Sequence, residues 1–76
     1  MVTAKCLTNI DPWTEHENGL TIGQSYKVKS IDMGSSLTLV RLEGQPGLYN
    51  SITLEFSEDG KPLNIFGDRR FNPYIR

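Results

Sequence analysis

The residue types best suited to chemistry gather first in an acidic segment near the N-terminus, which contains Asp11, Glu15, His16 and Glu17. Carboxylates and an imidazole are ligands that divalent cations accept. The spacing, however, lacks the alternating Asp or Asn residues and the Gly of a calcium loop. His16 could titrate near neutral pH, but no candidate nucleophile lies beside it in the sequence. We therefore expect a solvated acidic loop, with no bound metal, no cofactor and no catalytic residue.

A second candidate lies at the C-terminus, where Arg69, Arg70 and Arg76 interleave with Phe71 and Tyr74. Guanidinium groups bind phosphates and aromatic rings stack on bases, so this composition is typical of a small nucleic-acid-binding patch. The pattern therefore predicts nucleic-acid binding as one candidate function of the chain.

The alternative for Arg69 and Arg70 is structural, because they could flank a side chain that plugs the core and pair with Asp68 or with the Glu58–Asp59 turn. We favour this alternative, since three basic charges on a net-acidic domain release few counterions and bind nucleic acid weakly. Lys27 and Lys29, which we expect on the outward face of a strand, could extend the basic patch. The nucleic-acid hypothesis is therefore our second choice.

A third group could bind a protein partner. Trp13, the only tryptophan, stands in the acidic segment between Asp11 and Glu15, near Glu17. It is either a lid over the core or an exposed anchor, because tryptophan is frequent in both places. Leu48 and Tyr49 follow a rigid Gly-Gln-Pro-Gly turn and could form an interface or belong to the core. We predict a partner-binding site at Trp13, Glu15, Glu17, Leu48 and Tyr49.

The composition limits the classes to which the chain can belong. Its 76 residues, 37% hydrophobic and 22% charged, predict one globular domain spanning residues 1–76. A domain of about this size buries roughly 60% of its unfolded surface. Cys6 is the only cysteine, which excludes an internal disulfide, and the formal net charge is −1. We expect no targeting segment, no membrane span and no catalytic activity, and a cytoplasmic location.

Hydrophobic alternation predicts an all-β fold with no helix of ordinary length. The expected strands are residues 2–8, 26–33, 37–43, 48–57 and 63–66, with a polar loop at 9–19 and a hairpin turn at Asp59–Gly60. A bulge or a strand end is expected where the alternation slips, between Ser30 and Ile31. The pattern also predicts a buried Cys6, a 3₁₀ turn at 68–71 and a core position for Phe71.

Several of these stretches together resemble the small SH3-like β-barrel proteins of bacteriophage and prophage genomes. The resemblance rests on Ala4-Lys5-Cys6-Leu7, on Leu20-Thr21-Ile22-Gly23-Gln24-Ser25-Tyr26-Lys27-Val28, on the Ser57-Glu58-Asp59-Gly60 hairpin and on Arg69-Arg70-Phe71. It implies a five-stranded SH3-like barrel that binds proteins, peptides or nucleic acid and has no catalytic activity. The segment from about Ser35 to Asn50 is an addition to the compact form of that pattern.

Three functions follow as expectations. The first is a phage-type binding protein that docks on a host or phage protein in the bacterial cytoplasm and could inhibit or redirect it. The second is a nucleic-acid-binding module that uses Lys27, Lys29, Arg69, Arg70 and Tyr74. The third, weaker than both, is a sponge for small ligands, assembled from several copies through edge strands.

Overall fold

The computed structural model describes residues 1–12 and 14–75, and within them the fold is all-β, as predicted. The strands are β1 (Val2–Cys6), β2 (Ser25–Met33), β3 (Thr38–Leu42), β4 (Tyr49–Asn50), β5 (Leu54–Glu58) and β6 (Lys61–Pro62). Two 3₁₀ turns complete the fold, η1 (Ser51–Thr53) and η2 (Ile65–Gly67). The described part of the chain contains no helix that could cross a membrane.

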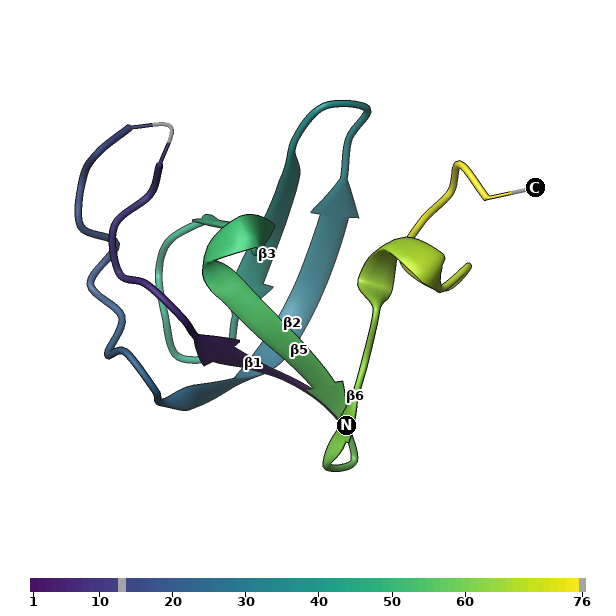
Figure 1. The fold of residues 1–76 in the computed structure, drawn as a ribbon, viewed down its shortest axis with the longest axis horizontal. Helices are drawn as coiled ribbons and strands as arrows, with labels where there is room; N and C mark the ends of the chain where they lie inside the picture. The colour runs from purple at the N-terminus through teal and green to yellow at the C-terminus, as the bar shows by residue number, and fades with distance from the viewer. Residues whose placement is uncertain (13, 76) are drawn as a thin grey trace.

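The strands form one antiparallel open sheet in the order β4-β3-β2-β1-β5-β6 (Figure 1). The sheet has six strands where the sequence predicted five, because residues 48–66 contain three short strands, β4, β5 and β6, and not the two that were expected. β2 joins the two halves: Ser25–Lys27 pair with β1, and Val28–Met33 pair with β3. The register shifts between Val28 and Ser30, so the predicted bulge is present close to its expected place.

The predicted strand at 48–57 is wrong at its centre. The main chain turns there into η1, because the Asn50 side chain accepts a hydrogen bond from the Ile52 main-chain N at 3.2 Å. The Thr53 hydroxyl donates back to the Asn50 carbonyl oxygen at 2.7 Å. Such local side-chain bonds compete with strand pairing. As a result Ile52 is 57% exposed, while Leu54, two residues later, is buried.

The predicted strand at 63–66 is also wrong. Pairing ends after Pro62, and the Asn64 side chain accepts a hydrogen bond from the Phe66 main-chain N at 3.1 Å, which starts η2. The 3₁₀ turn near the C-terminus therefore exists, but at 65–67 rather than 68–71. Residues 68–71 instead form a single turn in which the Phe71 main-chain N donates to the Asp68 carbonyl oxygen.

The core lies on the concave side of the bent sheet. It consists of Ala4, Cys6, Leu20, Met33, Val40, Leu42, Tyr49, Leu54, Phe56 and Ile65, with Phe71 and five other partly buried side chains packed against it. Cys6 is 1% exposed, as predicted for a structural thiol, and burial raises its pKa. The hairpin turn is also as predicted, since Asp59 and Gly60 both have positive φ angles and Glu58 pairs with Lys61.

Candidate binding groove

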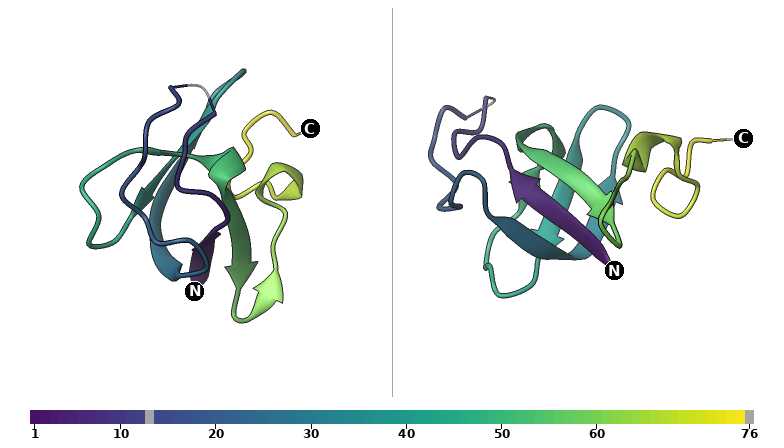
Figure 2. Two further views of the ribbon diagram at one scale, coloured as in Figure 1. Left: turned by 60° about the vertical axis from the view of Figure 1, so that its left-hand side comes forward. Right: turned by 60° about the horizontal axis from the view of Figure 1, so that its bottom comes forward.

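A groove of about 490 Å³ runs between the β2–β3 turn, η1 and the C-terminal segment. The views in Figure 2 show these three parts of the chain beside the same side of the sheet. Large exposed apolar side chains line the groove: Leu37 (41% exposed), Ile52 (57%), Phe66 (50%) and Tyr74 (60%). None of the residues that line it carries a charge. The groove is therefore an apolar surface that stays open to solvent.

Two asparagines hold Ile52 and Phe66 in place. Asn50 precedes Ile52 by two residues and accepts its main-chain N–H, and Asn64 does the same for Phe66. In each case a 3₁₀ turn begins directly after the asparagine. Asparagine favours this bond because its short side chain reaches the main chain two residues on. Each asparagine therefore fixes an apolar side chain on a short turn at the surface.

A third asparagine holds the end of the chain against η2. The Asn72 Oδ1 atom accepts the Tyr74 main-chain N–H at 2.9 Å, and its Nδ2 atom donates to the Phe66 carbonyl oxygen at 2.7 Å. Because one side chain bonds both neighbours, Phe66 and Tyr74 keep a fixed relation. The aromatic wall of the groove thus depends on Asn72.

The opposite wall is the tight β2–β3 turn. The Gly34 main-chain N donates to the Leu37 carbonyl oxygen at 2.9 Å, which closes the turn and sets the position of Leu37. A Cβ atom at Gly34 would lie only 2.8 Å from that oxygen. Glycine is therefore required at Gly34 by close approach of the main chain.

At the floor of the groove lies Asn50, whose residue surface is 4% exposed. Its Nδ2 atom is buried and has no hydrogen-bond partner among the described residues. An unpaired buried donor costs free energy, of the order of 1–3 kcal/mol. The other amide atom of Asn50, Oδ1, accepts the hydrogen bond that begins η1, which offsets part of this cost.

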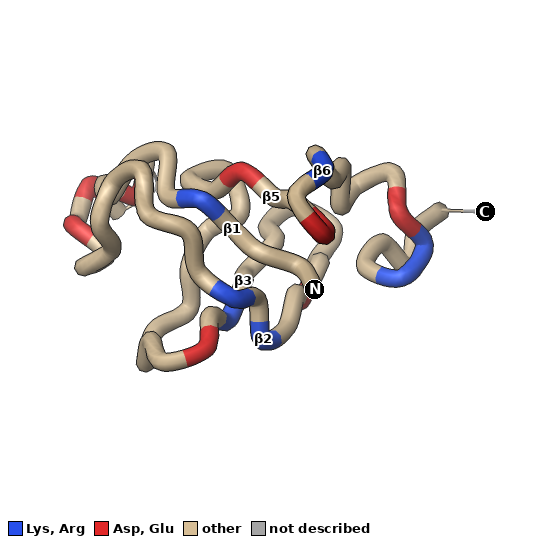
Figure 3. Tube along the Cα trace, turned by 90° about the horizontal axis from the view of Figure 1, so that it is seen from below, with Lys and Arg blue, Asp and Glu red and all other residues tan. Residues whose placement is uncertain are grey.

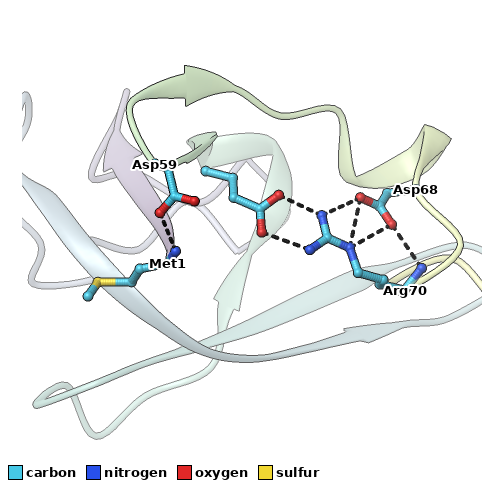
Figure 4. A network of polar contacts seen from close by, with 5 residues as sticks. Met1, Asp59, Asp68 and Arg70 are labelled. Atoms are coloured by element: carbon cyan, nitrogen blue, oxygen red, sulfur yellow. Dashed lines mark hydrogen bonds and ion pairs between the residues drawn. The ribbon is translucent and has the colours of Figure 1, made fainter.

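An ion-pair network fastens the segment that follows η2 (Figure 4). The Arg70 guanidinium donates to both Glu58 carboxylate oxygens at 2.7 Å and to Asp68 Oδ2 at 2.6 Å. These hydrogen bonds lower the pKa values of Glu58 and Asp68 and raise the pKa of Arg70. The guanidinium also lies 5.1 Å from the centre of the Phe71 ring. The network therefore ties the C-terminal segment to β5.

Among the described residues predicted to bind a protein partner, three are exposed and one is buried. Trp13 lies outside the described residues. Glu15 and Glu17 are exposed on the loop between β1 and β2, where Glu17 forms an isolated bridge with Ile10. Leu48 is 50% exposed, but Tyr49 is 5% exposed and belongs to the core. The structure corrects the prediction for Tyr49, because its pairing with Val40 turns the ring inward.

The predicted nucleic-acid residues are also separated. Lys27 and Lys29 are exposed on β2, whereas Tyr74 lines the groove. Arg70 forms the ion pairs that we favoured as the structural alternative, and Arg69 is exposed. Arg76 lies outside the described residues. Of the C-terminal residues that the structure describes, Arg70 is therefore engaged by carboxylates and Tyr74 belongs to the groove.

The sequence reasoning missed the groove residues Leu37, Ile52 and Phe66. A signal existed in the repeated pattern of Asn, any residue, then a large apolar residue, at 50–52, 64–66 and 72–74. The same pattern at Asn18–Leu20 ends in a buried leucine, however. The pattern therefore predicts the turn, but it does not predict whether the apolar side chain is exposed.

Among the described residues, no three His, Cys, Asp or Glu side chains are placed to hold a metal ion.

Comparison with known proteins gives one match. Residues 14–76 match the model of the family described as bacteriophage T4 protein Y07B. Searches of curated proteins and of solved structures each found no match.

Proposed function

The chain belongs to the bacteriophage T4 protein Y07B family, and from this premise we propose that it is a noncatalytic phage protein that docks on a host or phage protein. The apolar groove is the docking surface, and the cytoplasm of the infected bacterium is the place of action. Binding there would inhibit or redirect the partner.

The order of the strands supports an SH3-like barrel as the scaffold. Strands β4-β3-β2-β1-β5 are neighbours in that order, η1 connects β4 to β5, and the longest loop connects β1 to β2. β2 bends at its register shift and so takes part in both halves of the sheet. β6 adds a two-residue edge to this arrangement. Small barrels of this kind are expected to act by binding.

The observation that carries the proposal is the gathering of Leu37, Ile52, Phe66 and Tyr74 around one uncharged groove. Large apolar side chains held on rigid turns form good interface anchors, because little conformational entropy is lost when they bind. Ile52 and Phe66 also line a second, neighbouring hollow, which extends the apolar surface toward β5 and β6. The partner segment is therefore expected to be apolar and uncharged where it enters the groove.

The two other functions have less support. A nucleic-acid site at the C-terminus would need Arg70, but its guanidinium is engaged by Glu58 and Asp68. A sponge built through edge strands would need long edges, and β4 and β6 have two residues each. We therefore place protein docking first.

The test compares two isoleucines with nearly equal exposure. Ile52 is 57% exposed in the groove, and Ile22 is 59% exposed outside it. Tagged wild-type protein and the variants Ile52→Glu and Ile22→Glu are used to capture proteins from bacterial lysate, with and without nuclease, and thermal unfolding confirms that each is folded. We expect one protein to survive nuclease treatment on wild type and Ile22→Glu and to be lost on Ile52→Glu. Equal capture by both variants would refute the groove as the docking surface.

A further inference from the structure

Four asparagines of the described residues form the same local hydrogen bond, in which the side-chain Oδ1 atom accepts the main-chain N–H two residues on. They are Asn18, Asn50, Asn64 and Asn72, with N···O distances of 2.9, 3.2, 3.1 and 2.9 Å. Three of these turns hold side chains of the groove. Asn18 lies elsewhere, at the end of the loop between β1 and β2, and does not line the groove. The groove therefore gives no account of this fourth turn.

This hydrogen bond brings two reactive groups close together. The carboxamide carbon of an asparagine, Cγ, can be attacked by the main-chain nitrogen of the next residue, which closes a succinimide ring. The hydrogen bond holds Cγ near that nitrogen, because the ring of atoms that the bond closes contains both. The donating N–H also points at the oxygen on which negative charge develops during the attack, as in an oxyanion hole. Each of the four turns thus presents an activated carboxamide to the nitrogen that follows it.

The four turns differ in this attacking nitrogen. After Asn72 it belongs to a proline, which has no N–H proton to lose. In two other turns it belongs to Ser51 and Ile65, which are 5% and 1% exposed, so water has little access to remove the proton. The branched side chain of Ile65 also crowds the approach to its nitrogen. These three turns are therefore unsuited to the reaction.

Gly19, which follows Asn18, has none of these obstacles. It is exposed, its φ angle is +82°, and a Cβ atom built on it would meet nothing within 4 Å. In the part of the chain that the structure describes, no main-chain hydrogen bond engages its N–H. Because glycine has no Cβ, its nitrogen is unhindered and the main chain beyond it can follow as the ring closes. Asn18 is itself partly exposed, so water reaches its carboxamide.

We propose that Asn18 modifies itself by this reaction and is converted through a succinimide to a mixture of aspartate and isoaspartate. The Gly19 nitrogen forms a bond to Asn18 Cγ and loses its proton to water. The Cγ–Nδ2 bond then breaks, and the amide nitrogen takes a proton from water and leaves as ammonia. The Leu20 N–H, 2.9 Å from Oδ1, donates to the developing oxyanion. A water molecule adds to either carbonyl carbon of the ring and opens it, so water is the co-reactant.

Conversion changes the loop in two ways. A carboxylate appears next to Glu17, which makes the formal net charge of −1 more negative by one unit. Figure 3 shows the acidic positions of this loop at the end of the molecule opposite the C-terminus, so the new charge joins like charges. Isoaspartate also lengthens the main chain by one carbon atom between the Asn18 N–H, which donates to the Asn9 carbonyl oxygen at 2.7 Å, and the buried Leu20. The converted loop should therefore be held less tightly.

The experiment incubates the folded protein at mildly alkaline pH in water labelled with heavy oxygen. Released ammonia is measured, and peptide mapping by mass spectrometry locates the label. We expect a single heavy oxygen at Asn18, ammonia in equal amount and a more acidic band in isoelectric focusing. Asn18→Ser keeps an oxygen that can accept the Leu20 N–H but has no carboxamide, so it should lose all three signals. Asn64→Ser, the matched control in the turn that begins η2, should react at the wild-type rate.

The reference for the effect of the turn is a short peptide of residues 17–22, which has the same sequence without the fold. We expect the folded protein to react at least as fast as this peptide, because the Leu20 N–H is already in place. Slower reaction in the folded protein would show that the turn protects the carboxamide and would overturn the proposal. Equal labelling at Asn64, or undiminished ammonia release by Asn18→Ser, would also overturn it.

Discussion

The hydroxyl of Thr53 offers the sharpest test of how η1 is built. Thr53 is fully buried, and its Oγ1 atom donates to the Asn50 carbonyl oxygen at 2.7 Å. Thr53→Val keeps the shape of the side chain but removes the hydroxyl donor, so this hydrogen bond is lost, while the Asn50 carbonyl oxygen keeps the main-chain bond that begins η1. Losing one such hydrogen bond costs roughly 0.5–1.5 kcal/mol in free energy of unfolding.

The loss is large for a chain of this length. Stabilities of about 0.05–0.15 kcal/mol per residue give roughly 4–11 kcal/mol for 76 residues. In a domain of this size each kcal/mol lowers Tm by about 4–8 °C. Thr53→Val should therefore lower Tm by roughly 2–12 °C, and the denaturant midpoint should fall without a change in the slope of the transition.

Thr53→Ser is the matched control, because it keeps the hydroxyl and removes only a buried methyl group. That change costs about 1 kcal/mol. Both variants should be less stable than wild type in urea unfolding. If Thr53→Val were as stable as wild type or more stable, apolar contact and not the hydrogen bond would hold η1, and the reasoning would be refuted.

Two further changes test the walls of the groove. Gly34→Ala places a Cβ 2.8 Å from a main-chain oxygen and should cost about 1–3 kcal/mol in urea unfolding, whereas Ser35→Ala, at an exposed position of the same turn, should cost little. Equal stability of both variants would contradict the close contact. Arg70→Gln should destabilise the protein at pH 7, because Glu58 and Asp68 have lowered pKa values and contribute stability only when ionised. The difference from wild type should shrink as the pH falls below their ordinary pKa values of 4.5 and 3.8, and a difference unchanged at pH 3 would exclude this origin.

Local signals in the sequence predicted much of the fold. Alternation located β1 and β2, because one face of each strand must be buried, and a run with apolar residues on both faces located β3. The Asp59–Gly60 pair located the hairpin, since both residues accept positive φ angles. The same alternation failed at 48–57, where Ile52, Leu54 and Phe56 continue the strand pattern across a 3₁₀ turn. The spacing of hydrophobic residues does not reveal the hydrogen bonds that Asn50 forms, and these bonds turn the main chain into η1.

The candidate sites were less predictable than the fold. Tyr49 was expected at an interface, but pairing with Val40 places it in the core. Exposure of Ile52 and Phe66 could not be foreseen, because a large apolar residue in sequence is more often buried. The pairing of Arg70 with carboxylates was favoured from sequence, since acidic residues lie close to it along the chain.

By itself, then, the sequence determined the class of the fold, the buried cysteine and the balance of charge, which depend on residue type and local order. Only the tertiary structure decided where those residues meet. The groove unites the β2–β3 turn, η1 and the C-terminal segment. Such surfaces arise from strand register and chain reversal, and both are set by long-range pairing that no local pattern encodes.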